Sequence, residues 1–108
     1  MEKKSLEEAR VFAPDVFNRK VLFRHTNSTA FVLNFMPGQS LPPHRHPDHV
    51  LYLLVLEGSG TVTVDGAPTA IAAGDTICSE GEELFAFENS GTTPARLYAV
   101  LSKRSDDQ

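Results

Sequence analysis

Cysteine, tryptophan, basic residues and long apolar runs are scarce or absent in this sequence of 108 residues. Its single cysteine, Cys78, excludes an intramolecular disulfide and a paired-cysteine redox motif. The longest apolar run, residues 50–56, is far shorter than the roughly 20 residues that a membrane-spanning helix needs. The net charge is −4 and there is no basic stripe, which argues against a nucleic-acid partner. Because residues 1–8 also lack an apolar signal segment, we expect a soluble cytoplasmic protein that binds neither nucleic acid nor membrane.

The residues that are present predict a single β domain. Hydrophobic residues make up 41% of the chain, enough for one core at this length. Short apolar segments alternate with turn signals such as Asp65-Gly66 and Gly74-Asp75, and no amphipathic helix follows residue 12. This pattern is typical of a small antiparallel barrel or sandwich. The predicted strands cover residues 20–25, 30–36, 50–57, 61–65, 69–72, 75–79, 84–88 and 95–101, with a proline-rich bend before residue 50.

The N-terminal segment predicts a different local structure. Ser5 followed by Glu8 resembles a capping box, so we expect a short helix over residues 5–10, ended by Pro14. We therefore divide the chain into a helix and arm (1–19), a barrel (20–102) and a disordered polar tail (103–108). A small barrel leaves strand edges that must be covered, which predicts a homodimer, with residues 11–17 as the candidate contact.

Three of the four histidines lie close together, at His44, His46 and His49. Residues two apart on an extended strand project from the same face, so the rings of His44 and His46 can face one ion. Neutral imidazoles suit Zn, Fe, Ni and Cu. His49 is either a third ligand, leaving the open position of a catalytic metal, or a solvent-facing turn residue.

The spacing of Gly38, His44, His46 and Gly58 resembles the first motif of the cupin family, and residues 73–75 resemble the opening of its second motif. The likeness is to small single-domain cupins of the type-2, RmlC-like kind and covers roughly residues 30–100. It implies an all-β, antiparallel double-stranded β-helix (a jelly-roll barrel), here with the short N-terminal helix added. It also implies one divalent transition metal (Zn, Fe, Mn, Ni or Cu) inside the barrel.

The sequence departs from that family pattern at two ligand positions. The glutamate of the first motif falls at Leu51, and aligning Asn89 with the end of the second motif puts Phe85 where the fourth ligand, a histidine, would be. Two histidines alone rarely hold a metal tightly. The same substitutions predict an apolar interior with a few polar groups, which suits a small-molecule pocket. The predicted pocket residues are Asn34, Leu51, Tyr52, Leu53, Phe85 and Phe87.

Two small-molecule functions remain open at this point, beside a third alternative, a structural or interaction module that dimerises through an edge strand. One is a metal-dependent enzyme, dioxygenase- or isomerase-like, with the ion on His44 and His46 and a small organic substrate. The other is a metal-free cupin that binds or senses a small molecule without catalysis.

Overall fold

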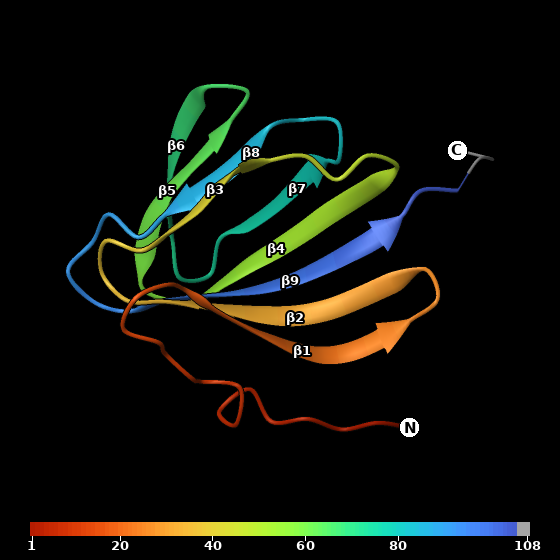
Figure 1. The fold of residues 1–108 in the computed structure, drawn as a ribbon, viewed down its shortest axis with the longest axis horizontal. Helices are drawn as coiled ribbons and strands as arrows, with labels where there is room; N and C mark the ends of the chain where they lie inside the picture. The colour runs from red at the N-terminus through yellow and green to blue at the C-terminus, as the bar shows by residue number, and fades with distance from the viewer. Residues whose placement is uncertain (106–108) are drawn as a thin grey trace.

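The computed structural model describes residues 1–105, which form two antiparallel sheets (Figure 1). One sheet has five strands in the order β1-β2-β9-β4-β7, and the other has four in the order β3-β8-β5-β6. The predicted all-β, antiparallel architecture is confirmed. The strands are β1 (Asn18–His25), β2 (Ser28–Phe35), β3 (Ser40–His44), β4 (His49–Glu57), β5 (Ser59–Val64), β6 (Ala67–Ala72), β7 (Thr76–Glu80), β8 (Phe85–Glu88) and β9 (Ala95–Lys103).

The core lies between the sheets and follows the alternation of the strands. In β4, Leu51, Leu53 and Val55 are buried while Tyr52 points outward, as expected for a strand with one wetted face. From the other sheet Phe87, 1% exposed, packs its ring 4.9 Å from that of Phe35. Large buried apolar side chains of this kind supply most of the free energy that favours folding.

Two turn predictions need correction. The Gly-Ser-Gly sequence at residues 58–60, between two predicted strands, predicts a hairpin, but β4 and β5 belong to different sheets, so Gly58 carries the chain from one layer to the other. Its φ is +78°, and a Cβ there would lie 2.3 Å from the carbonyl oxygen of Pro94, so only glycine fits. The proline-rich bend contains the edge strand β3, whose pairing with β8 is irregular between Leu41 and His44 because prolines cannot donate to the ladder.

The predicted N-terminal helix is wrong, because no helix occurs within residues 1–105. Residues 6–9 form a turn with short-range bonds from Ala9 N to Leu6 O and from Arg10 N to Glu7 O, both 3.1 Å. Side chains of the barrel bind backbone carbonyls that would accept hydrogen bonds within a helix. Arg96 donates to Leu6 O at 2.7 Å, and the Asn34 amide donates to Ala9 O at 2.8 Å. Tertiary hydrogen bonds therefore override a weak local helix preference. Residues 1–105 therefore contain no helix that could cross a membrane.

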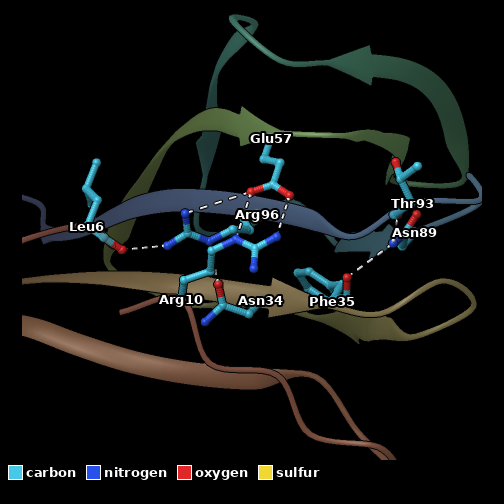
Figure 2. A network of polar contacts seen from close by, with 8 residues as sticks. All are labelled: Leu6, Arg10, Asn34, Phe35, Glu57, Asn89, Thr93 and Arg96. Atoms are coloured by element: carbon cyan, nitrogen blue, oxygen red, sulfur yellow. Dashed lines mark hydrogen bonds and ion pairs between the residues drawn. The ribbon is translucent and has the colours of Figure 1, made fainter. Parts of the chain in front are cut away.

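A polar network fixes this N-terminal arm to the five-stranded sheet (Figure 2). Arg96, 5% exposed, donates from Nε to Asn34 Oδ1 at 2.9 Å, and its Nη1 lies 4.0 Å from Glu57. Glu57 also accepts two hydrogen bonds from Arg10, at 2.9 and 3.3 Å. Two guanidinium groups from distant parts of the chain thus share one carboxylate.

Glu57 is expected to make stability depend on pH. The hydrogen bond from Arg10, with the charges of Arg10 and Arg96, holds the pKa of Glu57 below its ordinary value of 4.5, against a smaller opposing effect of burial. A lowered folded-state pKa contributes stability above the unfolded-state pKa, and that contribution disappears as the pH falls through the folded-state value. Glu57→Gln should therefore lower the free energy of unfolding at pH 7, and the difference from wild type should shrink near pH 3. Urea unfolding at both pH values measures this, and an equal difference at the two would contradict it.

The remaining predictions concern the N-terminal arm (1–19) and the C-terminal tail (103–108). Ala9 is buried against the sheet and Phe17 stacks on Phe35 at 5.1 Å, so parts of residues 1–19 cover their own barrel. The homodimer, and the role of residues 11–17 in it, stay predictions. Lys103 still belongs to β9, and Arg104 ion-pairs with Glu80. The predicted disorder of residues 106–108 lies outside the described residues.

Candidate functional site

A cavity of about 440 Å³ lies between the two sheets, and we call it the barrel cavity. Its polar lining residues are Arg19, His44 and His46. The rest of its wall is apolar and comes from both sheets, with contributions from the arm: Phe17, Phe31, Leu33, Leu41, Leu51, Leu53, Phe85, Ala99 and Leu101. A largely apolar hollow with a few polar groups is the usual form of a small-molecule site.

His44 is held at the end of β3, opposite Phe85 on β8. Its Nδ1 lies 2.8 Å from the carbonyl oxygen of Pro42. A carbonyl can only accept, so Nδ1 carries the proton and Nε2 of the neutral ring is the unprotonated nitrogen. The ring of His44 meets that of His46 edge to face, with centroids 4.5 Å apart at 82°. The two histidines thus lie in contact at the cavity wall.

His46 reaches the cavity from the turn between β3 and β4, since the strand ends at His44. Two backbone hydrogen bonds hold this turn, from His46 N to Gly81 O at 2.9 Å and from Gly81 N to His49 O at 2.8 Å. A Cβ on Gly81 would lie 1.8 Å from His46 O, so the contact requires glycine. Burial lowers the pKa of His46, and the charges of His44, His49 and Arg19 lower it further. The lowered pKa keeps the ring of His46 neutral at pH 7.

The residues present do not fit a tightly held metal ion. His49 turns its Nδ1 to the carbonyl oxygen of Pro47 at 2.9 Å and does not line the barrel cavity. Within residues 1–105, no three His, Cys, Asp or Glu side chains are grouped so that they could hold a metal. Beside His44 and His46 the cavity presents the apolar Leu51 and Phe85, with the Phe85 ring 6.5 Å from that of His44. Two imidazoles fall short of the three or four protein ligands usual for such a site.

The predicted pocket residues are distributed over four places. Leu51, Leu53 and Phe85 line the barrel cavity, whereas Phe87 packs in the core against Phe35. Asn34 is fully buried in the network with Arg96, and Tyr52 is 50% exposed on the outer face. Of the polar groups expected in the pocket, His44 and His46 line the cavity, whereas Asn34 and Tyr52 do not.

Sequence reasoning missed Arg19. It pairs with Leu33 across β1 and β2, and cross-strand partners share a face, so Arg19 projects toward the cavity with Leu33. Its guanidinium carbon lies 4.4 Å from the ring centroid of Phe31, a cation–π contact. The two-residue spacing of Phe31 and Leu33 was a signal for the inward face of β2, but only the register reveals that Arg19 joins it.

The comparison with known proteins agrees with this geometry. Residues 31–101, more than half of the chain, match the family model described as a cupin domain. The chain belongs to the cupin family. An RmlC-like cupin protein from Desulfovibrio desulfuricans has a crystal structure similar to this cupin, with a TM-score of 0.84 and 23% identity over 94% of this chain and 96% of that one. This likeness shows the double-stranded β-helix fold alone.

Two relatives match parts of this cupin. The dimethylsulfoniopropionate lyase DddW of Ruegeria pomeroyi is 47% identical over 51 residues, which are 47% of this chain and 33% of that protein. The tetracenomycin polyketide synthase protein TcmJ of Streptomyces glaucescens is 30% identical over 70 residues, 65% of this chain and 47% of that protein. The chain spans less than half the length of either relative.

Proposed function

We propose that this cupin binds a small organic molecule in the barrel cavity and needs no resident metal ion to do so. The observation that carries the proposal is the cavity itself, about 440 Å³ with an apolar wall and two contacting histidines at its edge. Cavities of this size and lining hold small ligands in many proteins. The relatives named as a lyase of dimethylsulfoniopropionate and as a polyketide synthase protein also carry names that refer to small organic molecules.

The histidines serve in this proposal as polar contacts for the ligand. His44 offers an unprotonated Nε2, because its Nδ1 donates to Pro42 O. Such a nitrogen accepts a hydrogen bond from a hydroxyl or amide of a ligand. The apolar side chains that replace the missing metal ligands, Leu51 and Phe85, pack against the ligand body. Their burial on binding supplies the larger part of the affinity.

A cavity-filling variant tests the proposal. Ala99 lies between its cross-strand partners Phe31 and Leu53, and all three line the cavity. Ala99→Leu should therefore occupy the ligand's space. Thermal shift with benzyl alcohol, indole and phenylacetate gives the readout, since a ligand at a hundred times its Kd stabilises by about 2.7 kcal/mol. We expect stabilisation of the wild type, unchanged by a chelator, and none of Ala99→Leu.

Ala70→Leu on β6 is the matched control, because Ala70 is exposed and the change adds the same volume. This variant should bind as the wild type does. A wild-type protein that no compound stabilises, or an Ala99→Leu variant that still binds, contradicts the proposal. Elemental analysis of protein purified without added metal should give far below one equivalent. A full equivalent that leaves on His44→Ala would restore the metal-dependent alternative.

A further inference from the structure

Arg19 is exposed to solvent and is the one permanently charged side chain among the described residues that line the barrel cavity. Within residues 1–105 its guanidinium makes no hydrogen bond or ion pair, and its contact is the face of Phe31 at 4.4 Å. In contrast, Arg10, Arg96 and Arg104 all pair with carboxylates. The cavity thus carries a positive charge that the described part of the protein does not neutralise.

The other lining groups do not oppose an anion. Every lining residue in the described chain is apolar except Arg19 and the two histidines, so no carboxylate repels a negative charge there. Arg19 is exposed before a ligand binds, but a ligand seated on the apolar wall shields it from water, which strengthens the attraction between Arg19 and an anion. The cation–π contact with Phe31 restrains the guanidinium group, which reduces the entropy lost when a ligand binds it.

We propose that the ligand of the barrel cavity is an organic monocarboxylate with an apolar, aliphatic or aromatic body. This inference rests on the proposed function. The carboxylate binds the guanidinium of Arg19 through two parallel hydrogen bonds, the pairing that its planar fork matches best. The body lies along Phe31, Leu51 and Phe85. A phosphate is disfavoured, because a single cation faces the cavity and a doubly charged group takes several.

Paired probes separate the charge from the apolar body. Phenylacetate and phenylacetamide have nearly the same shape, as do hexanoate and hexanamide, and only the acids are charged at pH 7.5. A hydrogen bond to a charged group is worth enough to expect about ten- to hundredfold tighter binding of each acid to the wild type. Isothermal titration calorimetry measures each Kd.

Two variants test whether Arg19 causes the preference for the acid over the amide. Arg19→Met keeps the apolar stem over Phe31 and removes the charge, so it should bind acid and amide equally, with the amide affinity unchanged. Arg24→Met is the matched control, because Arg24 lies on the same strand, is exposed and does not line the cavity. It should keep the wild-type preference. If Arg19→Met also keeps that preference, or if wild type binds acid and amide equally, the inference is overturned while the proposed function stands. If neither member of any pair binds the wild type, both fail.

Discussion

Gly81→Ala is expected to unfold the histidine turn and to abolish ligand binding. The added Cβ would lie 1.8 Å from His46 O and 2.4 Å from His49 O, both rigid backbone atoms. The two strand-like hydrogen bonds between Gly81 and this turn cannot survive the separation that a methyl group requires. Overpacking costs about 1–3 kcal/mol and each lost hydrogen bond about 0.5–1.5 kcal/mol. We therefore expect a loss of about 2–6 kcal/mol in unfolding free energy.

Denaturant unfolding and calorimetric binding of phenylacetate measure the two effects together. The control is Gly91→Ala, where the nearest atom to an added Cβ is the mobile Ser59 Oγ at 3.3 Å, so a small adjustment of that side chain suffices. Gly91→Ala should remain close to wild type in both assays. An alanine at position 81 that left stability and binding intact would mean that the turn of His46 is not held by this contact.

Gly81 also shows which part of the candidate site could be predicted from the sequence and which part could not. The histidine pair was predictable, because the spacing of His44 and His46 with Gly38 and Gly58 is local and the family resemblance depends on it. The contact that fixes His46 joins segments 35 residues apart, and no local pattern marks it. Gly81 is followed by acidic residues, so in the sequence it resembles an ordinary solvated turn.

Arg19 and the N-terminal arm were unpredictable for a related reason. Whether Arg19 faces the barrel cavity depends on its register with Leu33 and on the irregularity later in β1, neither of which alternation alone determines. The arm shows the opposite failure, in which a local signal predicted a helix that tertiary contacts prevent. Ser5 does accept a hydrogen bond from Glu7 N, as a cap would, but Arg96 takes the next carbonyl. Alternation and turn signals found the strands other than β3, whereas long-range polar contacts decided the arm and part of the site.

Arg96→Met is expected to destabilise the protein strongly and to release the N-terminal arm. Arg96 is 5% exposed and donates to Asn34 Oδ1 and Leu6 O (Figure 2). Methionine keeps much of the volume but leaves both acceptors without these donors and removes one cation beside Glu57. Leaving a buried acceptor without its donor costs about 1–3 kcal/mol, so the two acceptors together predict a loss of about 2–6 kcal/mol. Urea unfolding should show a loss of this size.

Hydrogen exchange distinguishes arm release from general destabilisation. In Arg96→Met the amides of residues 6–10 should exchange much faster under native conditions, while those of β4 and β9, which pair along their length, stay protected. Arg24→Met, an exposed arginine of the same sheet, should change neither stability nor exchange. Because Phe17 follows the arm and lines the barrel cavity, loosening the arm should also weaken ligand binding. If residues 6–10 kept their protection in Arg96→Met, the hydrogen bonds of Arg96 would not be what holds the arm, and its apolar contacts would hold it instead.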